Sequence, residues 1–306
     1  MHDLIIIGAG PAGLSAALYA GRFRLDTLMF EKMAPGGQII LSGWIENYPG
    51  FPGGIDTQGL IEKFRKQAEE AGIGIISEDA LQITPLKNDA YSVKTDKKTY
   101  ETRSVIVASG AKSKSLGIQG EDKLLGKGVS YCATCDGPFF KGKDIVVIGG
   151  GDRAIEEASF LAGYARRVTV VHRRQQLRAS RILQEKVNAD PKVSFVLDSA
   201  IEEIGGQGRV EFVKVKNIKT GQASELACQG VFIFVGIRPN TEFVKNLLNT
   251  DEAGFIITEQ NLATSAAGIF ACGDCRKKTL YQVVNACGEG AVAADSAYKY
   301  LLESGF

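Results

Sequence analysis

The sequence lacks an excess of charge of either sign. Lysine and arginine total 36 against 35 aspartates and glutamates, which gives a formal net charge of +1. A chain balanced in this way carries no field that would favour nucleic acid or an anionic membrane. The expected partners are therefore small molecules or another soluble protein.

The chain also lacks a long apolar run. No stretch has the length of a membrane-spanning helix, and the first residues enter an apolar strand pattern without a basic flank or a cleavage site of small residues. These absences predict a cytoplasmic protein. A length of 306 residues leaves room for about two domains, each with a sizeable core.

Six cysteines are present, and two of them form a close pair, Cys132 and Cys135, followed by Asp136. Cysteines in a reducing compartment are mostly free thiols, so a C-x-x-C pair suggests redox catalysis. The sulfur nearer a helix N-terminus can react as a thiolate, and the adjacent carboxyl group can exchange protons with the sulfurs. Half of a zinc site and a static structural disulfide are the alternatives. Both are disfavoured, because no second pair follows at zinc-ribbon spacing and the protein is expected in the cytoplasm.

The first 31 residues have the pattern of a dinucleotide-binding unit. An apolar strand over residues 4–7 leads into G-x-G-x-x-G, a helix over residues 14–20, and a second strand that ends at Glu31. Such glycines let backbone amides approach a pyrophosphate at the positive end of the helix, and the carboxylate accepts hydrogen bonds from a ribose diol. The candidate residues are Gly8, Gly10, Pro11, Ala12, Gly13 and Glu31.

Later segments supply further candidates for the same cofactor. Loops rich in glycine and proline cover residues 35–38 and 46–54, a strand-like run over residues 268–274 ends in a carboxylate suited to a ribityl or phosphate group, and residues 282–302 predict a small-residue helix. The candidates are Gly37, Gln38, Asn47, Gly273, Asp274 and Gln282. Between these segments, the pattern predicts a helix over residues 58–72, two short strands over residues 91–102, and a separate buried strand over residues 105–108.

The same pattern of strand, glycine loop, helix and strand repeats after residue 143, with one chemical difference. His172 stands at the same offset from Gly149 as Glu31 does from Gly8, and arginines follow it where the first unit has an acid. A carboxylate suits a bare ribose, whereas arginines suit a 2′-phosphate, so the first unit is expected to bind FAD and the second NADPH. The candidates for NADPH are Gly149, Gly151, Asp152, Arg153, His172, Arg173, Arg174 and Arg178. The alternative for the arginines is that they form the solvated, basic start of a helix. The alternative for His172 is a packing or capping role.

Linker-like compositions at residues 111–117 and 237–241 predict the domain boundaries. The expected fold is α/β, with two Rossmann-like nucleotide-binding domains, the second inserted in the first. The FAD-binding domain comprises residues 1–114 and 240–306, and the NADPH-binding domain, residues 115–239, carries the C-x-x-C. Because the dithiol and the NADPH motif share one domain and both must reach the flavin, a rotation between the domains is expected.

The ordered set of motifs resembles one family over the whole chain: G-x-G-x-x-G, P-G-G-Q, E-N-Y-P-G, C-A-T-C-D, G-G-G-D-x-A, H-R-R-x-x-x-R, G-x-x-P-N and A-x-G-D. It is similar to the low-molecular-weight, bacterial-type thioredoxin reductases. The resemblance implies a homodimer that passes electrons from NADPH through FAD and a Cys132–Cys135 disulfide to thioredoxin. It also implies that Cys135 lies nearest the flavin, that Cys132 attacks thioredoxin, and that Asp136 donates the proton.

Three positions depart from that family pattern: Arg153 stands in place of a serine or threonine, Ile237 in place of a histidine, and Tyr281 in place of an arginine. These changes fall near the nicotinamide and the flavin, so NADH or ferredoxin is the alternative electron donor. A dithiol oxidase would not need the arginine cluster, and a non-catalytic nucleotide sensor would need neither Cys135 nor Asp136. A second C-x-x-C, Cys272 and Cys275, is interpreted as buried small residues, with an auxiliary redox or metal role as the alternative.

Overall fold

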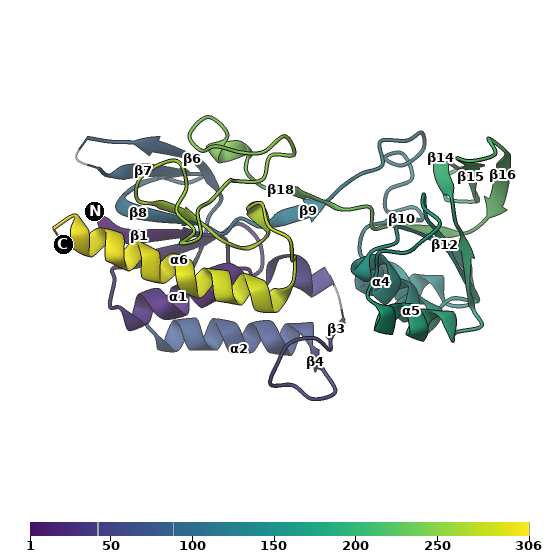
Figure 1. Cartoon of the computed structure of the whole chain (residues 1–306), viewed down its shortest axis with the longest axis horizontal. Helices are drawn as coiled ribbons and strands as arrows, with labels where there is room; N and C mark the ends of the chain where they lie inside the picture. Colours follow the sequence, from purple (N-terminus) through teal and green to yellow (C-terminus); the bar gives the residue numbers. More distant parts are fainter. Residues whose placement is uncertain (42, 88, 306) are drawn as a thin grey trace. The chain divides into compact units, whose positions relative to one another are not determined.

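The chain folds into two compact units, of which the first is discontinuous in sequence. The computed structural model describes residues 1–41, 43–87 and 89–305. The first unit joins Met1–Lys112 with Arg238–Phe306, and the second, Ser113–Ile237, is inserted between them. The chain passes from one unit to the other through β9 (Ala111–Ser113) and β18 (Ile237–Pro239), which pair with each other (Figure 1).

A mixed sheet centred on β1 (His2–Ile7), with β6 (Ala80–Pro85) and β7 (Tyr91–Thr95) as its antiparallel strands, forms the core of the first unit. Its neighbours are β2 (Thr27–Glu31) and β8 (Thr99–Val107), both parallel to it. The remaining strands of this sheet are β5 (Ile75–Ser77) and β19 (Ile269–Ala271). The expectation of a separate strand after residue 104 is wrong, because β8 is one nine-residue strand whose first part pairs with β7 and whose last part pairs with β19.

Both faces of this sheet are covered, which explains the unbroken apolar run of β1. Leu4 and Ile6 pack with the helices, whereas Ile5 and Ile7 pack against β7 and residues that follow β18. This alternation is the two-residue period of a strand. The covering helices are α1 (Pro11–Arg22), α2 (Thr57–Glu70) and α6 (Val283–Glu303), which lie together along one face of the sheet (Figure 1).

The second unit repeats the arrangement on a smaller scale. Its parallel sheet has the strand order β10-β17-β11-β12-β13. The strands are β10 (Val129–Ser130), β11 (Asp144–Ile148), β12 (Arg167–Val171), β13 (Val193–Val196) and β17 (Gly230–Ile233). Helices α4 (Asp152–Ala162) and α5 (Arg181–Asn188) cover one face, and an antiparallel sheet covers the other. That sheet comprises β14 (Ser199–Gly205), β15 (Phe212–Asn217) and β16 (Ala223–Ala227).

Each unit therefore contains a strand, a glycine loop, a helix and a second parallel strand, as the sequence predicts. The Rossmann-like α/β fold class is confirmed. The shorter elements are η1 (Gly37–Leu41), β3 (Trp44–Ile45), β4 (Ile55–Asp56), α3 (Ala133–Asp136), η2 (Gly137–Phe140), η3 (Glu242–Val244) and η4 (Gly273–Cys275). Within the described ranges, no helix is both long and apolar enough to cross a membrane.

Candidate functional site

The predicted redox cysteines lie at the start of α3 and are joined to each other by a disulfide. Cys132 is the N-cap of this short helix, and its Sγ accepts the backbone N–H of Cys135 at 3.1 Å. A sulfur that accepts a hydrogen bond is stabilised as a thiolate, which favours Cys132 as the nucleophile after reduction. Solvent exposure instead favours Cys135 as the nucleophile, because Cys135 is exposed and Cys132 is half-buried.

The backbone of Cys132 is fixed by the buried Ser130. The Ser130 hydroxyl accepts the N–H of Cys132 at 3.0 Å and donates to its carbonyl oxygen at 3.1 Å. Tyr131, between them, donates its hydroxyl to the buried carboxylate of Glu121, which also accepts the backbone N–H of Gly117 at 2.7 Å. Burial and that contact raise the pKa of Tyr131, so it remains a phenol. The segment entering the dithiol is thus held within the second unit.

Asp136 is the last residue of α3. Its backbone N–H donates to the carbonyl oxygen of Cys132 at 3.2 Å, and its side chain is half-buried. A carboxyl group one residue beyond Cys135 lies close in the chain to both sulfurs. Its role as a proton donor stays a prediction.

The first glycine loop has the geometry of a phosphate-binding turn. Gly8 has a φ of +106°, and a Cβ there would lie 2.3 Å from the carbonyl oxygen of Ala108. A Cβ on Gly13 would lie 1.8 Å from the carbonyl oxygen of Gly8. Gly10 caps α1 without a side-chain hydrogen bond, so the first amides of the helix stay open to a ligand.

Residues from distant parts of the chain converge on this loop. A Cβ on Gly37 would lie 3.4 Å from the Cα of Gly10, and one on Gly273 would lie 2.8 Å from the Cβ of Ala12. Glu31 accepts the N–H of Ala9 at 2.8 Å and so holds the loop against the end of β2. The absence of side chains at these glycines leaves room for an extended ligand to lie against the backbone.

Two amide side chains predicted to bind the same ligand lie in contact, although 235 residues separate them: Asn47 Nδ2 donates to Gln282 Oε1 at 3.0 Å. The side-chain oxygen of Gln38 is buried and has no hydrogen-bond partner in the described structure. A buried acceptor without a partner is costly, and a bound N–H or O–H group would satisfy it. The donor set of the first unit therefore fits a dinucleotide with a hydrogen-bonding ring system.

The second glycine loop, before α4, is equally tight. Gly149 has a φ of +146°, and a Cβ there would lie 2.4 Å from the carbonyl oxygen of Phe234. The segment that carries the arginines is tied to this loop, because Arg178 N–H donates to the carbonyl oxygen of Gly150 at 2.6 Å. Asp152 Oδ1 accepts the N–H of Ser180 at 2.7 Å. Gly151 caps α4 without a side-chain hydrogen bond, as Gly10 does in α1.

Three arginines lie exposed beside this second loop: Arg173, Arg174 and Arg178. In the second unit, every residue of which is described, none of their guanidinium groups forms an ion pair with a carboxylate. Guanidinium groups without partners favour a phosphate through charge-assisted, often bidentate hydrogen bonds. The cluster therefore fits a nucleotide with an additional phosphate.

His172 lies inside the unit rather than on this surface. It is 5% exposed, and its ring lies over Gly150, where a Cβ would come within 2.6 Å of the ring atoms. Burial, and then the charges of Arg178 and Arg174, lower its pKa, so the ring is neutral at physiological pH. This placement agrees with the alternative that His172 has a packing role. Contact of His172 with NADPH stays a prediction.

The Arg153 side chain is half-buried and contacts other residues of the second unit. Its guanidinium lies 3.4 Å from the carbonyl oxygen of Tyr131, 3.5 Å from Ser113 Oγ, and 5.3 Å from the centre of the Phe234 ring. Burial lowers its pKa. The side chain thus contacts the residue that precedes Cys132, and its assignment to NADPH stays a prediction.

The second C-x-x-C is confirmed as a pair of buried residues. Cys272 and Cys275 have no exposed surface, and Cys275 Sγ donates to the carbonyl oxygen of Val107 at 3.3 Å. Burial raises the pKa of Cys275 to about 11 and holds the pKa of Cys272 well above its usual range, so neither forms a thiolate readily. Among the described residues, no group of three or more histidines, cysteines or acids is arranged to hold a metal ion.

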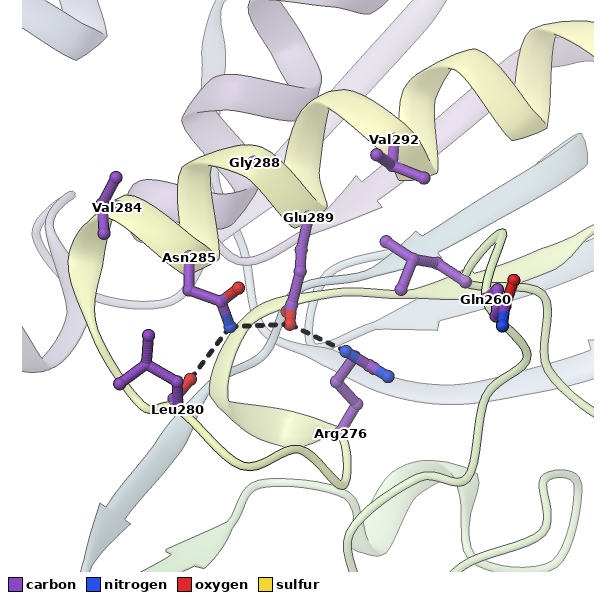
Figure 2. Close-up of a pocket in the computed structure, with 9 residues that line it drawn as sticks. Gln260, Arg276, Leu280, Val284, Asn285, Gly288, Glu289 and Val292 are labelled. Atoms are coloured by element: carbon purple, nitrogen blue, oxygen red, sulfur yellow. Dashed lines mark hydrogen bonds and ion pairs between the residues drawn. The ribbon is translucent and has the colours of Figure 1, made fainter.

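A set of buried charges beside Gly273 was not predicted from the sequence. Glu289 on α6 accepts the Gly273 N–H at 2.8 Å and pairs with Lys278. Arg276 pairs with the same carboxylate (Figure 2). The sequence signal was an acid between Gly288 and Gly290, in the part of the helix that is rich in small residues.

The architecture and the dithiol define the class of the protein. The chain matches the family described as pyridine nucleotide-disulphide oxidoreductase over residues 2–290, and it belongs to that family. It is 45% identical to thioredoxin reductase of Peptoclostridium acidaminophilum, over 98% of this chain and 97% of the relative, and 45% identical to that of Listeria monocytogenes, over 99% and 95%.

A solved structure of Lactococcus lactis thioredoxin reductase agrees with the present fold at a TM-score of 0.97 and 42% identity, covering 99% of this chain and 100% of that one. Within the larger family, the chain belongs to the thioredoxin reductases. The family expected from the motif order is thereby confirmed.

Proposed function

We propose that the protein reduces the disulfide of thioredoxin with electrons from NADPH, by way of FAD and the Cys132–Cys135 pair. One observation carries this proposal: the bonded cysteine pair shares a unit with a glycine loop and three exposed arginines that lack ion-pair partners. A dithiol oxidase or a ferredoxin-dependent enzyme would not need that cluster.

The first unit would hold FAD. The open amides of α1 would hold the pyrophosphate, Glu31 would bind the adenosine ribose, and Asp274 would bind the ribityl chain. The orphaned oxygen of Gln38 and the Asn47–Gln282 pair supply polar contacts near the ring. The full set is Gly8, Gly10, Pro11, Ala12, Gly13, Glu31, Gly37, Gln38, Asn47, Gly273, Asp274 and Gln282.

The second unit would hold NADPH on the α4 loop, with Arg173, Arg174 and Arg178 on the 2′-phosphate. Gly149, Gly151, Asp152, Arg153 and His172 complete the proposed set. Asp152 contributes by holding the Ser180 backbone and with it the arginine-bearing segment. FAD, when bound, relays electron pairs between the nicotinamide and the disulfide.

The cysteine pair carries the electrons to the substrate. Its S–S bond takes up two electrons and two protons and becomes two thiols. The Cys132 thiolate then attacks one sulfur of the thioredoxin disulfide, which forms a mixed disulfide and releases a thiolate on thioredoxin. Cys135 attacks the Cys132 sulfur, restores the internal disulfide and releases the second thioredoxin thiolate. This assignment follows the hydrogen bond from Cys135 N–H to Cys132 Sγ rather than the exposure of the two residues.

Asp136 would move the proton in these steps. As a carboxylate it accepts a proton from an attacking thiol, and as an acid it returns one to a departing thiolate. Its position directly after Cys135 supports this role.

We propose the expected domain roles for the two halves: FAD in residues 1–114 with 240–306, and NADPH in residues 115–239. Because the dithiol and NADPH would share one domain, alternation at the flavin requires a rotation about the segments that contain β9 and β18. A crosslink between the domains should abolish turnover; unchanged turnover would rule the rotation out.

The same proposal includes a cytoplasmic homodimer. Leu280, Val284 and Val292 expose apolar surface around a pocket of about 510 Å³ beside α6 (Figure 2), and a second copy of the chain would cover them. Sedimentation analysis should give twice the chain mass, and Val292→Glu should shift the protein toward monomer.

The activity is tested by following NADPH consumption by the purified flavin-containing protein, with and without oxidised bacterial thioredoxin. We expect consumption that requires thioredoxin, is slower with NADH, and is lost in Cys135→Ser. Consumption that continues without thioredoxin in air would indicate an oxidase. Reduction of thioredoxin by reduced ferredoxin but not by NADPH would replace the donor.

A further inference from the structure

Glu289 is a buried carboxylate at the centre of a charge network next to the proposed FAD site. It is 8% exposed, and its side chain projects from α6 toward Arg276 (Figure 2). Its carboxylate also contacts the η4 turn through the Gly273 N–H. Burying a carboxylate costs several kcal/mol unless it is paired and hydrogen-bonded. The partners of Glu289 therefore indicate what the residue holds in place.

Four donors surround the two carboxylate oxygens. Oε1 accepts from Arg276 Nη1 at 2.7 Å and from Asn285 Nδ2 at 3.0 Å. Oε2 accepts the Gly273 backbone N–H at 2.8 Å and a hydrogen bond from Lys278 Nζ at 3.4 Å. A carboxylate satisfies all four donors because both of its oxygens accept hydrogen bonds. A glutamine would place its NH₂ group against two of these donors, where it could not accept.

The network continues to Asp274. The Lys278 side chain is 4% exposed, and its Nζ lies 3.0 Å from Asp274 Oδ1. Two carboxylates, Asp274 and Glu289, thus balance two cations, Arg276 and Lys278. Lys278 occupies one oxygen of Asp274, and the other oxygen makes no hydrogen bond within the described structure. The side chain of Asp274 is 30% exposed, so this free oxygen can face a ligand.

The turn that carries Asp274 needs such support. Gly273 has a φ of +75°, and a Cβ there would lie 2.8 Å from the Cβ of Ala12, so the turn sits directly against the start of α1. The carboxylate of Glu289 holds the N–H of Gly273, and through Lys278 it holds the side chain of the next residue. A satisfied buried polar network of this kind fixes one geometry more than it adds stability.

We propose that Glu289 is a positioning residue for the flavin cofactor: it holds the Gly273–Asp274 turn so that the free oxygen of Asp274 meets a hydroxyl of the ribityl chain. The inference rests on the proposed FAD site and adds a residue that itself does not touch the cofactor. Lys278 is the link between Glu289 and Asp274.

The test compares wild-type protein with Glu289→Gln, Lys278→Met and, as a control, Asp295→Asn. Asp295 lies on the same helix, in an exposed ion pair with Lys299, and outside the network. Each purified holoprotein is stripped of FAD and titrated back, with the quenching of flavin fluorescence giving the dissociation constant. Apoprotein and holoprotein are also melted and followed by circular dichroism.

We expect Glu289→Gln to raise the dissociation constant for FAD by about tenfold or more, because buried donors lose a charged acceptor. Lys278→Met should have a similar effect, and Asp295→Asn a change within about twofold. The gap between the apoprotein and holoprotein melting temperatures should shrink in Glu289→Gln. A purely structural role would lower both melting temperatures together and leave the dissociation constant unchanged.

Unchanged FAD affinity in Glu289→Gln would overturn the positioning role while leaving the proposed function intact. Failure of the wild-type protein to bind FAD would overturn both. If Glu289→Gln does not fold, Lys278→Met decides by the same criterion, since methionine fills the buried position without a charge.

Discussion

Replacing Arg178 by alanine should weaken the use of NADPH and leave NADH unaffected. The guanidinium is exposed and has no carboxylate partner in the fully described second unit, while the Arg178 backbone stays anchored to the carbonyl oxygen of Gly150 at 2.6 Å. The substitution therefore removes one charged donor without loosening the segment. A charged hydrogen bond contributes about 1.5–3 kcal/mol, which corresponds to a loss of about 10- to 100-fold in kcat/KM for NADPH.

The assay measures kcat/KM for both nucleotides at saturating thioredoxin. NADH lacks the 2′-phosphate, so its kcat/KM should change by less than about twofold. Arg167→Ala is the matched control: it removes the same charge from an exposed position at the amino end of β12, whereas the cluster follows the carboxyl end. An equal loss for NADPH and NADH, or an unchanged value for NADPH, would refute the assignment of the cluster to the 2′-phosphate.

Three further predictions concern the second unit. Burial lowers the pKa of His172, so the unfolded chain binds a proton at a higher pH than the native protein does. The free energy of unfolding should therefore fall as the pH drops below about 6.5 toward the lowered pKa. In urea unfolding, His172→Phe should lose less stability over that pH range than the wild-type protein does. An equal pH dependence in both proteins would contradict this. Ser130→Ala removes both hydrogen bonds to the Cys132 backbone and should destabilise the oxidised protein by about 1–3 kcal/mol in denaturant unfolding. An unchanged unfolding midpoint would show that these two hydrogen bonds do not stabilise the protein. Cys135→Ser should trap a covalent complex with thioredoxin on a non-reducing gel, and Cys132→Ser should not; the reverse result would make Cys135 the attacking sulfur.

The two glycine loops were readable from the sequence because part of their requirement lies in the local backbone. Gly8 and Gly149 have φ values of +106° and +146°, a conformation that favours glycine, whereas the close approach of the Ala108 and Phe234 carbonyl oxygens to these glycines depends on the fold. The dithiol was likewise readable, since a C-x-x-C spacing brings two sulfurs together within one turn.

The length of β8 could not be read from hydrophobicity. Thr102 and Ser104 interrupt the apolar pattern, yet both are fully buried in the strand. Their hydroxyls donate to the carbonyl oxygens of Ser104 and Gly268, at 2.9 and 2.8 Å, which removes the cost of burying them. The partner of Ser104 lies 164 positions away and depends on tertiary structure, so the polar residues resembled a strand end in the sequence.

Side-chain direction was the other limit. The sequence places Arg153 at the start of the helix predicted to bind NADPH, but its guanidinium lies against the carbonyl oxygen of Tyr131 and the Phe234 ring. Glu289 was not singled out from the sequence, yet it is buried and accepts the N–H of Gly273, 16 positions away. Both arrangements are set by packing between elements and leave no periodic signal.

The most direct test of the account is an anaerobic titration of the purified yellow protein with NADPH, in parallel with NADH, following the flavin absorbance. We expect bleaching after about two equivalents of NADPH, one for the disulfide and one for FAD, with the colour restored by oxidised thioredoxin. If neither nucleotide bleaches the flavin while dithionite does, the arginine cluster does not bind the electron donor, and NADPH is not the source of electrons.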